Sequence, residues 1–185
     1  MFGPAYFLAG DSHPNDSYIA DALRARLGAC FESWTGQDAI LPAGAPDWES
    51  YERRADAFDR YRAGRRHERL PVLFGRSSGA RVVARHAGRH PAAAVVCIGY
   101  PFRSPGREEE PDRYIHLAKI AVPTLVIQGR DDRYGAAGVP STYRLAPTVR
   151  YRLIDGDHEL HLSEAAWDEV ARAILSFCIA TCPTR

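Results

Sequence analysis

Short continuous runs of apolar residues alternate with amphipathic segments along almost the whole chain. The apolar runs predict strands at 5–10, 30–34, 70–75, 92–100, 122–129 and 149–156. Strands that are apolar on both faces and separated by helices are typical of a parallel sheet covered on both sides. The pattern therefore predicts an α/β protein.

The segments between these strands carry apolar residues three or four positions apart, which predicts helices. Asn15 or Asp16 can cap the first helix. Asp47 can cap a second, with Trp48 on its apolar face. Ser163 can cap the last. A further helix is predicted directly after the strand at 70–75.

Two segments of the chain depart from this regular alternation. In 149–156, Arg150 and Arg152 alternate with apolar residues. Charged side chains of this kind prevent an exposed strand from pairing with another chain, so we place this strand at the edge of the sheet. The longest connection, 101–120, is rich in proline and charge and predicts a lid-like surface excursion. Since no repeat or linker divides the chain, we expect residues 1–185 to form a single domain.

Composition places the chain among soluble globular proteins, with 45% hydrophobic and 25% charged residues. The net charge of +1 gives no support for a nucleic-acid or anionic-membrane partner. No apolar run reaches 18 residues, and the start of the chain lacks the basic region of a signal peptide. We therefore expect a cytoplasmic monomer or small homo-oligomer that acts on a small molecule.

The cysteine and histidine spacings do not match known metal sites. Cys30, Cys97, Cys178 and Cys182 form no C-x-x-C pair. Buried thiols are expected for Cys30 and Cys97, and no further ligands accompany Cys178 and Cys182 at the end of the last helix. The stretch "HELH" lacks the second histidine of H-E-x-x-H, because Leu162 occupies that position. We expect neither a metal nor an organic cofactor.

Reactive side chains follow three of the predicted strands. Ser77 lies in "GRSSG" after the third strand, Asp131 and Asp132 follow the fifth, and His158 follows the sixth. The carboxyl ends of parallel strands meet at one edge of a sheet, where ligands bind. The pattern therefore brings a serine, a carboxylate and a histidine to one rim, in the chain order Ser, Asp, His.

On these motifs the chain resembles a small α/β-hydrolase over nearly its whole length, near the dienelactone-hydrolase-like group. "GRSSG" resembles the nucleophile elbow, "QGRDDRYG" the acid loop and "DGDHEL" the histidine segment, while "YPFRSPGR" follows the fourth strand as in that group. The resemblance implies a reduced α/β-hydrolase fold, with about six mostly parallel strands, helices on both faces and no large cap domain.

The resemblance also implies roles for individual residues. Ser77 would be the nucleophile and His158 the general base. Asp132 holds the G-x-x-D position of the acid, and Asp131 is the alternative.

The oxyanion hole is assigned in the same way. Ser78 would supply one backbone N–H, and Asp11 or Ser12 the second. Arg76, inside the elbow, can face the substrate or pair with a carboxylate.

We expect a serine hydrolase that cleaves a small carboxylic ester or thioester through an acyl-enzyme intermediate. One alternative is an amide, lactone or peptide hydrolase with the same triad. Another is a hydrolase-fold binding module with little turnover. An open, shallow pocket is expected because only the 101–120 excursion can cover it, with His13 and His116 as candidates for its border.

Overall fold

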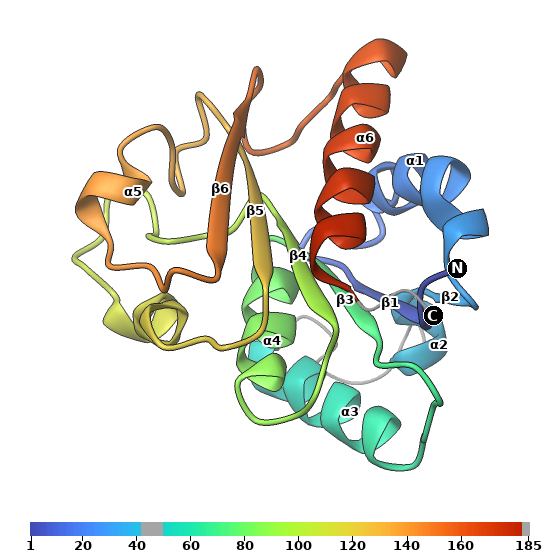
Figure 1. Cartoon of the computed structure of the whole chain (residues 1–185). Coiled ribbons are helices and arrows are strands. Elements are labelled where there is room, and N and C mark those ends of the chain that lie inside the picture. The colour runs from blue at the N-terminus through green and yellow to red at the C-terminus, as the bar shows by residue number, and fades with distance from the viewer. Residues whose placement is uncertain (42–49, 183–185) are drawn as a thin grey trace.

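A computed structural model describes residues 1–41 and 50–182, and these contain one sheet of six strands (Figure 1). The strands are β1 (Ala5–Leu8), β2 (Trp34–Thr35), β3 (Val72–Arg76), β4 (Ala94–Ile98), β5 (Thr124–Gly129) and β6 (Val149–Ile154). They lie in the order β2-β1-β3-β4-β5-β6, and every neighbouring pair is parallel. The predicted fold class is confirmed, and the pairing is wholly parallel.

Successive residues of the central strands enter two different hydrophobic cores. Phe7, Phe74 and Val96 are partners across β1, β3 and β4 and face one core. Their sequence neighbours Leu73 and Val95 face the other. This is why these strands read as unbroken apolar runs: side chains alternate between the two faces, and both faces are buried.

Helices cover both cores, as predicted. The longer ones are α1 (Ser17–Leu27) and α6 (Glu164–Thr181) on one face and α3 (Tyr51–Ala63) and α4 (Ser78–Ala87) on the other. The shorter ones are α2 (Gln37–Ile40), α5 (Val139–Thr142) and the 3-10 helices η1 (Gly28–Cys30), η2 (Pro111–Arg113) and η3 (Ile115–Ala118).

The helix starts agree with the sequence pattern in part. Ser163 caps α6, where its hydroxyl accepts a hydrogen bond from the N–H three residues on. Asp16 occupies the cap position of α1 but makes no capping hydrogen bond; its buried carboxylate lies 3.9 Å from Arg76 Nε. Asp47 and Trp48 lie outside the described residues, and Ser50 caps α3.

The two edges of the sheet behave differently. β6 is an edge strand, as its alternating arginines predicted. The strand predicted at 30–34 is wrong in extent: Phe31 makes only an isolated bridge, and regular pairing is confined to Trp34–Thr35. The rings of Phe31 and Trp34 instead pack against Phe74, at centroid distances of 5.6 and 4.9 Å. Aromatic packing explains the apolar character of this segment.

The connection between β4 and β5 is the excursion predicted at 101–120. Its described residues form the two short 3-10 helices η2 and η3 and no cap domain. Phe102, Leu117 and Ile120 are buried in the core on the α4 face. The excursion is therefore packed onto the body of the fold at both ends.

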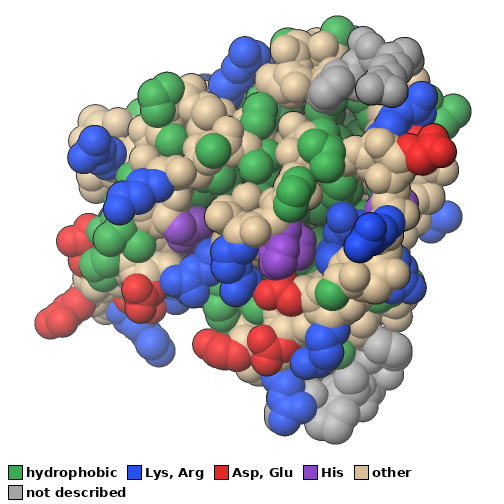
Figure 2. All heavy atoms as spheres, turned by 60° about the horizontal axis from the view of Figure 1, so that its bottom comes forward, with side chains coloured by type: hydrophobic (Ala, Val, Ile, Leu, Met, Phe, Trp, Pro, Cys, Tyr) green, Lys and Arg blue, Asp and Glu red, His purple; other side chains and the backbone are tan. Residues whose placement is uncertain are grey.

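Charged groups of both signs are interspersed on the end of the molecule that lies at the bottom of Figure 1 (Figure 2). This mixture agrees with a net charge of only +1. Among the described residues, no helix has the length and apolar character needed to cross a membrane.

Candidate active site

A sharp turn between β3 and α4 presents Ser77. Its backbone has φ 49° and ψ −122°, a left-handed conformation that costs a non-glycine residue about 1–3 kcal/mol. The flanking glycines allow close approach: a Cβ on Gly75 would lie 2.5 Å from the Ala80 Cα, and one on Gly79 would lie 2.4 Å from the Leu8 carbonyl oxygen. Glycine is therefore required at both ends of "GRSSG", because any side chain there would clash with the neighbouring backbone.

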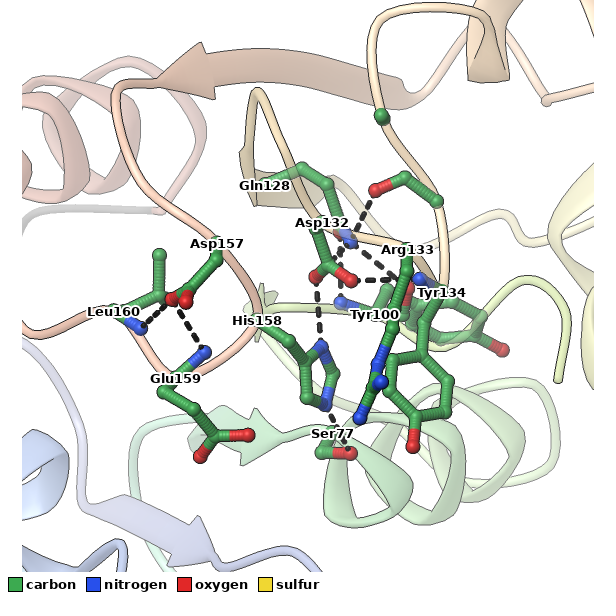
Figure 3. Close-up of polar contacts among 12 residues, drawn as sticks. Ser77, Tyr100, Gln128, Asp132, Arg133, Tyr134, Asp157, His158, Glu159 and Leu160 are labelled. Atoms are coloured by element: carbon green, nitrogen blue, oxygen red, sulfur yellow. Dashed lines mark hydrogen bonds and ion pairs between the residues drawn. The ribbon is translucent and has the colours of Figure 1, made fainter. Parts of the chain in front are cut away.

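Side chains from three strand ends form one chain of hydrogen bonds (Figure 3). Ser77 Oγ lies 3.1 Å from His158 Nε2, and His158 Nδ1 lies 2.8 Å from Asp132 Oδ2. Since Nδ1–H is donated to the carboxylate, Nε2 is left to accept a hydrogen bond. Of the two candidate carboxylates, Asp132 is the buried one that contacts the histidine, while Asp131 is exposed.

The Asp132 carboxylate is buried and fully hydrogen-bonded. Besides His158, it accepts from Gln128 Nε2 at 2.6 Å and from the Tyr134 backbone N–H at 2.8 Å (Figure 3). Gln128 is itself fixed, because its Oε1 accepts from the Tyr100 N–H at 2.8 Å. Sequence reasoning missed Gln128, for which the signal was a polar residue at the end of an apolar strand.

The loop that carries His158 is held by its own short-range contacts. Asp157 Oδ1 accepts from the backbone N–H groups of Glu159 and Leu160, at 3.0 and 3.3 Å. Leu160 has φ 55° and a completely buried side chain, so the fold holds it in an unfavourable conformation. The ring of Tyr134 packs against the imidazole at 4.2 Å. The position of His158 is thereby fixed from several sides.

Arg76 lies behind the histidine and is only 1% exposed. Its Nη2 donates to the His158 carbonyl oxygen at 2.6 Å, and its Nη1 lies 3.1 Å from His158 Nε2. Its Nε lies 3.9 Å from the buried carboxylate of Asp16. Of the two alternatives left by the sequence, the structure shows pairing with a carboxylate.

The loop after β1 reaches the elbow through a side chain. Ser78 Oγ donates to Asp11 Oδ1 at 2.7 Å, and Arg54 Nη2 lies 2.5 Å from the same carboxylate oxygen and 2.6 Å from Ser78 Oγ. The Arg54 side chain is completely buried. Sequence reasoning missed Arg54, although a charged residue among the apolar positions of α3 was a usable signal.

A cavity of about 550 Å³ opens over Ser77 and His158. Ser12 borders it, as do residues of the excursion. His13 and His116 are not among the residues that line it, so this expectation is wrong for both. His13 is hydrogen-bonded to Asp38, and His116 lies in a separate groove, where burial lowers its pKa to about 4.

One group of potential metal ligands occurs in the described residues, and it lies away from Ser77. Asp59, His86 and His90 have ligand atoms within 4.8 Å of one another. Both oxygens of Asp59 are already occupied, one by His86 Nδ1 at 2.5 Å and the other by Arg89 at 2.8 Å. Burial lowers the pKa of His86. This network links α3 to the end of α4 without requiring an ion.

The chain belongs to a family of α/β-hydrolase domains, because the family model described as an alpha/beta hydrolase domain matches residues 48–180. The resemblance found in the sequence is therefore confirmed at the level of the α/β-hydrolases. The closer likeness to the dienelactone-hydrolase-like group stays a prediction. A search of curated proteins gave no match.

Solved structures share the fold at low sequence identity. A protein classed as a YdeN-like hydrolase from Pectobacterium atrosepticum has a TM-score of 0.71 at 16% identity, over 98% of this chain and 94% of that one. An α/β-superfamily protein from Xanthomonas campestris pv. campestris has a TM-score of 0.66 at 19% identity, over 94% and 99%. The esterase domain of a Rhodothermus marinus protein has a TM-score of 0.67 at 14% identity, over 96% and 87%.

Proposed function

We propose that this protein is a serine hydrolase that cleaves a small carboxylic ester or thioester through an acyl-enzyme on Ser77. The observation that carries the proposal is the hydrogen-bonded chain from Ser77 Oγ through His158 to the buried carboxylate of Asp132. A serine hydroxyl is a weak nucleophile until a base takes its proton. The distance of 3.1 Å from Oγ to Nε2 is within reach for that transfer.

In the first half of the reaction, Ser77 Oγ attacks the carbonyl carbon while His158 Nε2 takes its proton. Asp132 keeps the imidazole in the tautomer in which Nε2 is unprotonated, and it stabilises the imidazolium that forms. His158 then returns the proton to the departing alkoxide or thiolate. In the second half, a water molecule attacks the acyl-enzyme with His158 as base, and Ser77 is regenerated.

The negative charge of the tetrahedral intermediate needs donors beside Ser77. As the first residue of α4, Ser78 has a backbone N–H with no acceptor inside the helix, at the positive end of the helix dipole. We assign it as the first oxyanion donor. The backbone of Asp11 or Ser12 is the candidate for the second, and Arg54 neutralises the Asp11 carboxylate that would otherwise repel the intermediate.

Arg76 acts in this proposal as a positioning residue. Its guanidinium contacts both the backbone carbonyl and the ring of His158, and the carboxylate of Asp16 compensates the charge of Arg76. His158, the proposed base, is therefore hydrogen-bonded to Arg76, the residue that immediately precedes Ser77.

Hydrolysis of 4-nitrophenyl acetate tests the proposal. We expect Ser77→Ala to lower kcat by at least about 10³-fold, and Ser176→Ala, at an exposed serine of α6, to leave it unchanged. Hydrolysis that survives Ser77→Ala would contradict the proposal.

A fluorophosphonate probe distinguishes an active serine hydrolase from a binding module that has the same fold. Such a probe reacts only with an activated serine, so an active hydrolase should be labelled at Ser77. If the probe labels Ser77 but no ester is turned over, amide and lactone substrates are the next class to assay. If Ser77 is not labelled, a binding module with a hydrolase fold is the better description.

A further inference from the structure

One wall of the cavity over Ser77 is basic. Arg81, which lies on α4 one helical turn beyond Ser77, lines it together with Arg107 and Arg113 of the β4–β5 excursion. Two acidic residues, Asp11 and Glu159, also line the cavity. The character of the pocket therefore depends on which of these charges are already compensated.

Both acidic residues have partners from outside the basic wall. Asp11 is paired with the buried Arg54 at 2.5 Å. The half-exposed Glu159 carboxylate lies 3.9 Å from Arg76, which it shares with the buried carboxylate of Asp16. Neither carboxylate makes an ion pair with an arginine of the wall in the described structure. Asp11 and Glu159 therefore supply no direct ion-pair partner to the arginines of the wall.

The three arginines of the wall differ in their contacts. Arg113 is bound to Glu110, with Nε 2.8 Å from Oε2, and to the Ser104 hydroxyl at 2.6 Å. In residues 1–41 and 50–182, no side-chain hydrogen bond or ion pair involves Arg81 or Arg107.

The guanidinium of Arg81 lies over the ring of Tyr51, 4.4 Å from its centroid. Its Nε is shielded from solvent and has no hydrogen-bond acceptor. The ring orients the cation without neutralising it. Arg81 is thus a fixed donor at the cavity wall that lacks an anion.

We propose that the substrate carries a carboxylate a few bonds from the scissile carbonyl, and that Arg81 and Arg107 bind this group. This inference rests on the proposed function and adds its substrate class. The guanidinium presents paired N–H donors that match the two oxygens of a carboxylate. A cavity of about 550 Å³ has room for such a small dicarboxylic monoester.

Two pairs of substrates of equal length test for the carboxylate. One pair has it on the acyl side: mono(4-nitrophenyl) glutarate and its methyl-capped diester. The other has it on the leaving group: 3-acetoxybenzoate and methyl 3-acetoxybenzoate. The readout is the ratio of kcat/KM for the charged ester to that for the neutral one. We expect this ratio to exceed about tenfold in at least one pair, the size of a charge-assisted contact.

Variants assign the preference to the basic wall. Arg81→Met and Arg107→Met remove the charge but keep an unbranched side chain, and each should move the ratio towards one. Arg172→Met, at an exposed arginine of α6, is the matched control and should keep the wild-type ratio. A ratio cancels any general loss of folded enzyme. A wild-type ratio near one in both pairs overturns the inference, as does a preference that survives both wall variants.

The two proposals fail in different ways. If neutral esters are hydrolysed through Ser77 without preference, only the carboxylate inference fails. If no ester is turned over, the proposed function fails, and calorimetric titration with glutarate then tests the wall by itself. We expect wild-type binding that weakens at least about tenfold in Arg81→Met, whereas no binding by the wild type overturns the inference.

Discussion

Two buried arginines, Arg76 and Arg54, contact the candidate catalytic residues from behind. Arg76 pairs with Asp16, and Arg54 with Asp11. Only the Arg76–Asp16 pair is buried on both sides, and removing one member of such a pair costs about 3–5 kcal/mol, whereas the Asp11 carboxylate is largely exposed and screened by solvent. These pairs therefore allow sharp tests with single substitutions.

For Arg76 we expect Arg76→Met to lower the free energy of unfolding by about 3 kcal/mol or more, because the Asp16 carboxylate, at 2% exposure, loses its cation. Urea denaturation measures this. Asp16→Asn gives the second single variant, and the double variant should lose clearly less than the sum of the two. Strict additivity would show that the two charges do not interact.

For Arg54 the expected effect is on catalysis. Arg54→Met leaves the Asp11 carboxylate uncompensated beside the proposed oxyanion hole, so kcat for 4-nitrophenyl acetate should fall at least about tenfold, with a smaller change in KM. Adding Asp11→Asn removes the repelling charge and should restore most of the loss. If the second substitution restores nothing, the damage is structural rather than electrostatic.

At the scale of elements, the junction of β3, α4 and β1 places the elbow. Ser78 and Gly79 begin α4 directly against the end of β1. The helix can sit this close to the strand only because a hydrogen atom replaces the side chain at Gly79. Steric contact here thus sets the position of the whole helix.

We expect Gly79→Ala to lower the melting temperature markedly and to reduce ester hydrolysis, because its Cβ would lie 2.4 Å from the Leu8 and Ala9 carbonyl oxygens. Gly88→Ala is the control: the nearest atom to its Cβ would be 3.4 Å away, and φ is −69°. Circular dichroism melts compare the two. Equal losses in both variants would refute the steric explanation.

The sequence predicted those features that are set by local hydrophobic patterns. The buried strands and the rim positions of Ser77, Asp132 and His158 follow from apolar runs and the geometry of parallel sheets. Gln128 and Arg54 each stand out as a polar residue in an apolar segment, but their contacts could not be predicted, because a single polar residue has no spacing that identifies its partner. The pairing of Arg76 with Asp16 joins positions sixty residues apart and depends on tertiary packing.

At the scale of the whole molecule, stability should depend on pH through His116. Burial lowers its folded-state pKa to about 4 from 6.5. Between pH 4 and pH 6.5 the unfolded chain binds the proton more readily than the folded protein. The contribution of His116 to stability is therefore fully present above about pH 6.5 and declines as pH falls towards 4.

Unfolding by urea at pH 7 and pH 5 measures this effect. We expect His116 to contribute about 2 kcal/mol of the decrease, which His116→Asn should remove. His161→Asn, at an exposed histidine, serves as the control and should leave the pH dependence as it is in the wild type. An identical slope in wild type and His116→Asn would contradict the assignment.

The contact between Arg76 and His158 joins the centre of the sheet to the loop after its edge strand. Edge strands open locally more often than central ones, and their amides exchange hydrogen sooner. Because the Arg76 side chain of β3 is hydrogen-bonded directly to His158, β6 can fluctuate without changing the distance between His158 and Ser77. Amide exchange would then be fast along β6 while the loop at His158 stays protected, so local opening of this edge strand would not limit the lifetime of the assembled site.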